Sequence, residues 1–112
     1  MKRAIVVANG QLRDPESARA AFRPGDLLIA ADGGAHHCRA LGLNPHVVVG
    51  DLDSLSPALR AQLEASGARF EIHPARKDET DLELAIRATM REGAQEVLIL
   101  AALGEQIGRA HV

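Results

Sequence analysis

The sequence predicts an α/β domain in which a mostly parallel β-sheet is flanked by helices. Two observations favour this fold class. Short aliphatic runs recur along the 112 residues, with helical patterns between them. Aromatic residues make up only 2% of the composition, and Trp and Tyr are absent. An aliphatic core of this kind is typical of strands that are buried on both faces of a parallel sheet.

Five segments are expected to form strands. Four of them are nearly continuous apolar runs, which indicates burial on both faces. The segment 70–72 is weaker because an acidic residue separates its two apolar ones. The expected strands are 4–8, 27–31, 47–49, 70–72 and 97–101.

Helical patterns occupy the gaps between these strands. Ser56-Pro57 is typical of an N-cap followed by proline in the first turn. Thr80 and Glu83 have the spacing of a capping box. The expected helices are 16–22, 35–41, a segment from Pro57 to Gly67 and a segment from Thr80 to Gly93. The alternation of strands and helices predicts a Rossmann-like, three-layer domain.

The composition argues against several classes of protein. The formal net charge is −2 and no basic stripe is visible, so we expect no nucleic-acid partner. The single cysteine, Cys38, has no partner for an internal disulfide, which favours the cytoplasm. No apolar run is long enough for a transmembrane helix, so we expect no membrane association.

Acidic residues follow three of the predicted strands. Asp32 comes after the second strand, Asp51 and Asp53 after the third, and the segment 77–81 after the fourth. Ligands of open α/β sheets bind at the carboxyl ends of strands, so these residues are expected at one edge. Two carboxylates ~4 Å apart repel by roughly 4 kcal/mol at an effective dielectric constant near 20, so the cluster needs a cation. Oxygen ligands alone suit Mg²⁺.

Other residues in these loops suit a phosphate-bearing ligand. Lys77 adds a positive charge, and Gly33-Gly34 lets the backbone approach a ligand closely. Neither a P-loop nor a Gly-x-Gly-x-x-Gly pattern is present. A nucleotide would therefore bind by another route.

Three ordered motifs, together with Asn9-Gly10, resemble those of thiamine pyrophosphokinases. They are Ala31-Asp32-Gly33-Gly34-Ala35, Gly50-Asp51-Leu52-Asp53-Ser54 and Lys77-Asp78-Glu79-Thr80-Asp81. The similarity runs over residues 4–104. It implies an enzyme that transfers pyrophosphate from ATP to the hydroxyl of thiamine, giving thiamine diphosphate and AMP. It also implies Mg²⁺ as the cofactor and a homodimer for the full-length protein.

The resemblance implies roles for individual residues. The catalytic candidates are Asp51, Asp53, Asp78 and Asp81. The candidates for binding ATP or its phosphates are Asn9, Asp32, Gly33, Gly34, Ser54, Lys77 and Thr80. The metal-ligand candidates are Asp51, Asp53 and Asp81. Asp32 and Asp78 are further candidates for holding metal-bound water or orienting the alcohol.

The end of the sequence departs from the family pattern. A Gly-Arg-x-Asp-His segment is expected after Gly104, but the chain reads Glu-Gln followed by Ile-Gly-Arg-Ala-His-Val. Those last six residues are one reading-frame translation of a common sequencing-adapter string. We therefore expect a catalytic domain over 1–104 that is incomplete at its C-terminus, and a non-native or atypical tail over 105–112. Impaired thiamine pyrophosphorylation is the expected consequence.

Other interpretations remain open. A related pyrophosphokinase that acts on a hydroxymethyl pterin also carries a Gly-Asp-x-Asp motif, and a non-catalytic Mg–nucleotide-binding module would have the same loops. Each motif taken alone also has a structural explanation as a turn or helix cap. A zinc site at His36-His37-Cys38 is disfavoured, because adjacent residues on a helix point in different directions.

Overall fold

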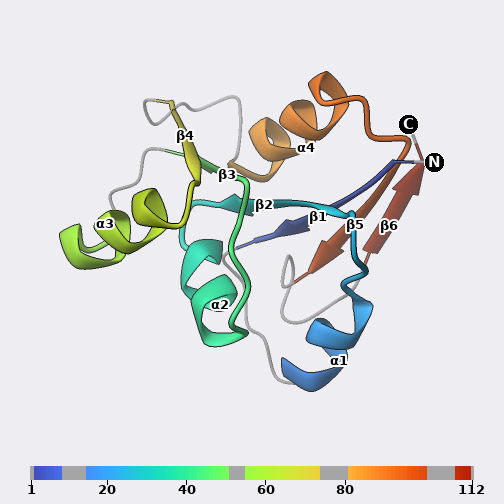
Figure 1. Cartoon of the computed structure of the whole chain (residues 1–112). Helices are drawn as coiled ribbons and strands as arrows, with labels where there is room; N and C mark the ends of the chain where they lie inside the picture. Colours follow the sequence, from blue (N-terminus) through green and yellow to red (C-terminus); the bar gives the residue numbers. More distant parts are fainter. Residues whose placement is uncertain (1, 9–14, 51–54, 74–80, 101–107, 112) are drawn as a thin grey trace.

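The computed structural model describes residues 2–8, 15–50, 55–73, 81–100 and 108–111. Within these ranges the chain forms one six-stranded sheet and four helices (Figure 1). The strands are β1 (Arg3–Val7), β2 (Leu27–Ala31), β3 (Val47–Gly50), β4 (Arg69–Ile72), β5 (Glu96–Leu100) and β6 (Gly108–His111). The helices are α1 (Pro15–Ala21), α2 (Gly34–Ala40), α3 (Pro57–Ala65) and α4 (Asp81–Arg91).

The strand order is β4-β3-β2-β1-β5-β6. The first five strands are parallel, and β6 pairs with β5 in the antiparallel sense. The chain builds outward from β1 to β4 and then returns to place β5 on the other side of β1. This reversal is a topological switch point, and it lies between β1 and β5. The predicted α/β class, with a mostly parallel sheet flanked by helices, is confirmed.

The helices form two layers on opposite faces of the sheet. In Figure 1, α4 lies above the sheet, and α1 and α2 lie below it. Helix α3 belongs to the lower layer, because its Leu59 and Leu63 join the same core cluster as Ala35 and Cys38 of α2. The sheet is therefore the middle of three layers.

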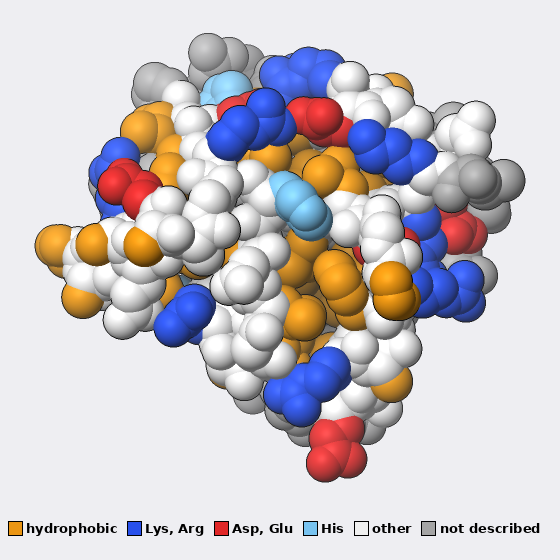
Figure 2. All heavy atoms as spheres, viewed as in Figure 1, with side chains coloured by type: hydrophobic (Ala, Val, Ile, Leu, Met, Phe, Trp, Pro, Cys, Tyr) orange, Lys and Arg blue, Asp and Glu red, His pale blue; other side chains and the backbone are white. Residues whose placement is uncertain are grey.

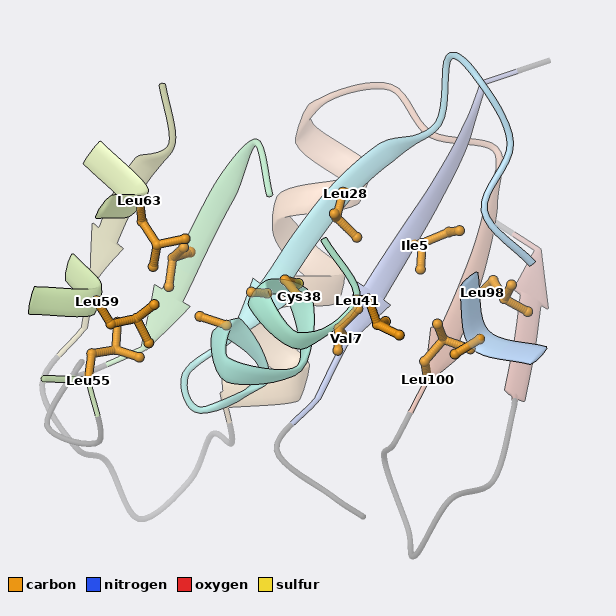
Figure 3. Packing of buried hydrophobic residues seen from close by; sticks show 14 residues of the cluster. Ile5, Val7, Leu28, Cys38, Leu41, Leu55, Leu59, Leu63, Leu98 and Leu100 are labelled. Carbon is orange, nitrogen blue, oxygen red and sulfur yellow. The ribbon is translucent and has the colours of Figure 1, made fainter. Parts of the chain in front are cut away.

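Alternate residues of each central strand supply the two halves of the core. Ile5 and Val7 belong to the cluster under α1, α2 and α3, whereas Val6 belongs to the cluster under α4. Figure 3 shows the first cluster, in which Ile5 of β1, Leu28 of β2 and Leu98 of β5 lie on the face of the sheet that carries α1 and α2. This two-sided burial explains why the strand sequences are continuous apolar runs rather than alternating ones.

The predicted elements agree with the structure to within about one residue at most ends. The Ser56 cap is confirmed, because the Leu59 backbone N–H donates to Ser56 Oγ at 3.1 Å. Cys38 is fully buried, and burial raises the pKa of its thiol to about 12. The capping box lies partly outside the described residues, since Thr80 does.

Strand β4 was the weakest of the five predictions, and its position explains the pattern. It pairs with β3 and lies at one end of the strand order. Phe70 is partly buried beneath the Arg60 guanidinium, whose carbon lies 5.3 Å from the ring centroid. Strand β6 was not expected from the sequence, and the boundary proposed after Gly104 stays a prediction.

The face of the molecule shown in Figure 2 carries both charged and hydrophobic side chains. Figure 2 shows basic and acidic side chains interspersed, with hydrophobic surface between α1 and α2. Partly buried Phe22 and Leu43 pack against the core cluster of this layer. Within the described ranges, no helix has the length and apolar character needed to cross a bilayer.

Candidate functional site

The parallel strands end at one side of the sheet, the carboxyl edge, and begin at the other, the amino edge. The carboxyl edge carries the described part of the candidate site. Asp32 follows β2 directly, and Gly50 ends β3. Asp81 begins α4, which leads from β4 to the parallel strand β5 and therefore starts at the same edge. The fold thus brings the ends of the three motif-bearing segments to one side of the molecule, as the sequence predicts.

Asp32 has an unusual local geometry. Its φ is +46°, in the left-handed region that residues other than glycine adopt infrequently, although aspartate and asparagine do so more often than most. Its N–H donates to the Val49 carbonyl at 2.6 Å, which extends the pairing of β2 with β3, and its carbonyl accepts from Ala35 N–H at 3.2 Å. The Oδ1 atom is buried and has no hydrogen-bond partner. The backbone of Asp32 is therefore fixed, while its side chain has an unmet acceptor.

Gly34 is required by close packing between α2 and β1. A Cβ atom placed on Gly34 would lie 1.9 Å from the Val7 carbonyl oxygen and 2.7 Å from its carbon. Both contacts are far shorter than van der Waals distance, and both are to backbone, which cannot rotate away. Packing thus explains this glycine, and a role for Gly33 and Gly34 in ligand binding stays a prediction.

Gly50 shapes the end of β3. Its φ is +143°, which L residues with a side chain rarely adopt. Its carbonyl accepts from the His73 N–H at 2.8 Å, so the pairing of β3 with β4 continues to the last residue before Asp51. The chain therefore leaves the sheet at Gly50 in a backbone conformation that depends on glycine.

The remaining candidates cannot be placed in the same way. Of the α4 residue Asp81, only the backbone position is described. The candidates outside the described residues are Asn9, Asp51, Asp53, Ser54, Lys77, Asp78 and Thr80. In the part of the chain that is described, no three His, Cys, Asp or Glu residues are grouped so that they could hold a metal ion.

The amino edge carries a buried ion pair that the sequence did not reveal. Arg3 donates from Nε to Asp26 Oδ1 at 3.1 Å and from Nη2 to Oδ2 at 2.5 Å. Arg3 Nη2 also donates to the Ala21 carbonyl at 2.6 Å, and Arg23 N–H donates to Asp26 Oδ2 at 2.8 Å. Burial alone would raise the pKa of Asp26, but the hydrogen bonds from Arg3 and Arg23, with the charge of both, lower it.

A second contact at the amino edge involves His46. The Leu28 N–H donates to His46 Nδ1 at 3.0 Å, and the His46 N–H donates to the Leu28 carbonyl at 2.7 Å. The imidazole thus takes the place of a strand carbonyl at the start of β2. Its Nδ1 must be unprotonated to accept this bond.

Comparison with known families and structures agrees with this architecture. The family described as thiamin pyrophosphokinase, catalytic domain, matches residues 19–110. A thiamine pyrophosphokinase structure from Bacillus subtilis superposes with a TM-score of 0.74 at 24% identity, over 94% of this chain and 49% of that one. A thiamin pyrophosphokinase family protein from Enterococcus faecalis gives 0.67 at 27% identity, over 95% and 49%.

A more distant structure gives the same fold. The thiamin pyrophosphokinase from Candida albicans superposes with a TM-score of 0.68 at 21% identity, over 81% of this chain and 32% of that one. Comparison with curated protein sequences finds no significant match. The chain spans about half the length of the two bacterial structures and about a third of the Candida structure. The family match covers most of the sequence, and the chain therefore belongs to the thiamin pyrophosphokinase family, within its catalytic domain.

Proposed function

We propose that this chain is the nucleotide- and metal-binding part of an enzyme that transfers pyrophosphate from ATP to the hydroxyl of thiamine. The observation that carries the proposal is the family match over residues 19–110. Family membership supports thiamine diphosphate synthesis in general, and the acidic loops at the carboxyl edge support ATP as the donor. The proposed products are thiamine diphosphate and AMP.

The reaction is a substitution at the β-phosphorus of ATP. The thiamine hydroxyl oxygen forms a bond to this phosphorus, and the bond from the phosphorus to the α–β bridging oxygen breaks. AMP leaves with the bridging oxygen, and the hydroxyl proton passes to solvent or to a nearby carboxylate. Catalysis of this kind consists mostly of positioning and of compensating negative charge.

The residues at the carboxyl edge fit a magnesium ion by their chemistry. They offer carboxylate oxygens, which Mg²⁺ prefers, and the unmet buried acceptor of Asp32 marks this edge as incompletely paired. Asp51, Asp53 and Asp81 are the proposed ligands. When bound, the ion would neutralise phosphate charge.

The other residues have supporting roles in the proposal. Lys77 supplies a positive charge for the phosphates, and Thr80, Ser54 and Asn9 supply hydrogen bonds near them. Asp78 orients the alcohol or holds a metal-bound water. The proposal extends to a homodimeric full-length enzyme in the cytoplasm.

The test combines ATP binding with product formation by the purified chain. We expect Mg-dependent ATP binding in calorimetry, and slow AMP release that requires thiamine. Asp51→Asn and Asp53→Asn should each lower AMP release by roughly 100-fold or more, because each removes the charge of a proposed Mg²⁺ ligand. Glu64→Gln, an exposed change on α3, is the matched control and should leave the rate unchanged.

Different outcomes identify different functions. AMP release that depends on a hydroxymethyl pterin instead of thiamine would identify the pterin as the substrate. ATP binding with no AMP release from either alcohol, both by this chain and by the full-length protein, would indicate a non-catalytic module. No binding of Mg–ATP would contradict the proposal as a whole.

A further inference from the structure

The unmet acceptor of Asp32 requires an explanation that the fold does not provide. Buried polar atoms in proteins are nearly always hydrogen-bonded, and an unpaired carboxylate oxygen is among the most costly exceptions. Asp32 Oδ1 is such an exception. It also belongs to a residue held at φ +46°, where the backbone is strained. An unpaired group on strained backbone points to a ligand more than to a structural role.

The Asp32 side chain takes no part in the hydrogen bonds that hold this turn and the start of α2. The N-cap residue of α2 is Gly33, and no side-chain hydrogen bond caps the helix. The backbone N–H and carbonyl of Asp32 are bonded to Val49 and Ala35, so neither requires its carboxylate. The carboxylate is therefore available to a group from outside the chain.

The chemistry of that group follows from the charge of Asp32. An ionised carboxylate accepts hydrogen bonds or binds a cation, so its partner carries an N–H, an O–H or a positive charge. Phosphate oxygens are acceptors with negative charge and would be repelled. A hydroxyl group of the ligand fits this requirement.

The position of Asp32 in the fold indicates which hydroxyl group of the ligand it binds. Asp32 follows β2, which lies beside β1, and β1 borders the topological switch point with β5. In dinucleotide-binding α/β sheets the ligand lies in the crevice at the switch point, and an acidic residue about 20 residues after the Gly-rich turn binds a ribose hydroxyl. This chain lacks the Gly-rich pattern, but Asp32 likewise follows the strand next to β1. We propose that the Asp32 carboxylate accepts hydrogen bonds from the ribose hydroxyls of the nucleotide. This inference rests on the proposed function only in requiring ATP as a ligand.

The carboxylate can reach a ligand with a small movement. Oδ1 is covered, but Asp32 as a residue is only partly buried. The last side-chain torsion of aspartate is soft and nearly two-fold. A turn about it exchanges the two oxygens without moving the backbone.

The test compares nucleotides with and without ribose hydroxyls on the 112-residue chain. Calorimetry with Mg²⁺ measures the affinity of ATP, of 2′,3′-dideoxy-ATP and of inorganic triphosphate. For the unaltered chain we expect dideoxy-ATP to bind roughly 10- to 100-fold more weakly than ATP, the usual range for hydrogen bonds to a charged acceptor. Inorganic triphosphate should bind equally well to the unaltered chain and to an Asp32 variant.

Two variants show that Asp32 is responsible. Asp32→Gly removes the carboxylate, and glycine adopts a positive φ without steric cost. Asp32→Asn keeps the shape of the side chain, removes its charge and also tolerates the positive φ. Both should abolish or greatly reduce the preference for ATP over dideoxy-ATP. Equal preference in the variants and the unaltered chain would overturn the assignment, as would the absence of any preference in the unaltered chain, which needs no variant to fold.

Failure of the inference is distinguishable from failure of the proposed function. If ATP does not bind at all, both fall together. If ATP binds and only the ribose preference is missing, the proposed function stands and the inference falls. If Asp32→Gly weakens thiamine binding and leaves ATP unaffected, the hydroxyl is that of the alcohol, and the ribose assignment is wrong.

Discussion

The acidic residues at the two edges of the sheet differ in whether their carboxylate oxygens are hydrogen-bonded. At the amino edge, Asp26 accepts hydrogen bonds from Arg3 and Arg23, and both of its oxygens are used. At the carboxyl edge, Asp32 has a buried oxygen with no partner. Both carboxylates flank β2, so the contrast arises within one short segment of the chain.

The two residues therefore differ in role: Asp26, before β2, stabilises the fold, whereas Asp32, after β2, is the proposed ligand-binding residue. A satisfied buried charge holds its surroundings in place, and removing one partner leaves the other uncompensated. An unsatisfied charge lowers stability and is retained where a ligand uses it. The amino edge therefore has a structural role, and the carboxyl edge is where we propose that the nucleotide binds.

The largest effect should come from breaking the amino edge. Asp26→Ala leaves the Arg3 guanidinium buried without its counter-ion, and we expect a loss of about 3–5 kcal/mol in the free energy of unfolding. Urea denaturation followed by circular dichroism measures it. The control is Glu64→Ala, which removes an exposed ion pair with Arg60 and should cost less than about 0.5 kcal/mol.

The pH dependence distinguishes the ion pair from simple packing. The folded-state pKa of Asp26 is lowered, so the pair stabilises the protein above the unfolded-state pKa of about 3.9. That contribution is lost as the pH falls through the folded-state pKa. The stability difference between the unaltered chain and Asp26→Asn should therefore shrink below about pH 4. A difference that stays constant down to acid pH would contradict a role for the charge.

A smaller loss should follow from crowding the carboxyl edge. Gly34→Ala forces a methyl group against the Val7 carbonyl, and we expect a loss of about 3 kcal/mol, at the upper end for overpacking. Gly67→Ala is the matched control, because its φ is +96° but nothing lies within 4 Å of an added Cβ. That control should lose only about 1 kcal/mol. Equal losses would mean that backbone conformation, and not the contact with β1, decides the outcome.

The smallest effect should have the opposite sign. Asp32→Gly removes the unpaired oxygen and relieves the left-handed strain, while glycine adds freedom to the unfolded chain. We expect a net gain of about 1 kcal/mol in thermal or urea denaturation without nucleotide. A clear destabilisation would show that Asp32 supports the fold, and the contrast between the edges would lose its basis.

Much of the fold could be predicted because its signals are local. The run Val47–Val49 is apolar and β-branched throughout, and Ser56-Pro57 marks a helix start, so both elements follow from neighbouring residues. The Arg3–Asp26 pair could not be predicted, because its partners are far apart in sequence and meet only when β1 and β2 pair. The acceptor role of His46 likewise depends on the pairing of β2 with β3.

The candidate site was predictable to a lesser extent. The sequence places Asp32 after a strand, and the structure adds its positive φ and its unmet oxygen. The sequence predicts that Gly34 lets the backbone approach a ligand closely, and the structure shows that packing against Val7 also requires a glycine there. Neighbouring residues cannot reveal such contacts, because they form between distant segments. The roles of Asp51, Asp53 and Lys77 remain predictions.

The central position of β1 has a consequence for how the protein is made. Its residues are synthesised well before those of β5, yet β5 is one of its two neighbours in the sheet, so that Arg3 is paired with Glu96. The middle of the sheet therefore cannot close until most of the chain has been synthesised. Pairing over such a sequence separation slows folding and leaves apolar strands exposed meanwhile. We expect the nascent chain to depend on chaperones until β5 emerges.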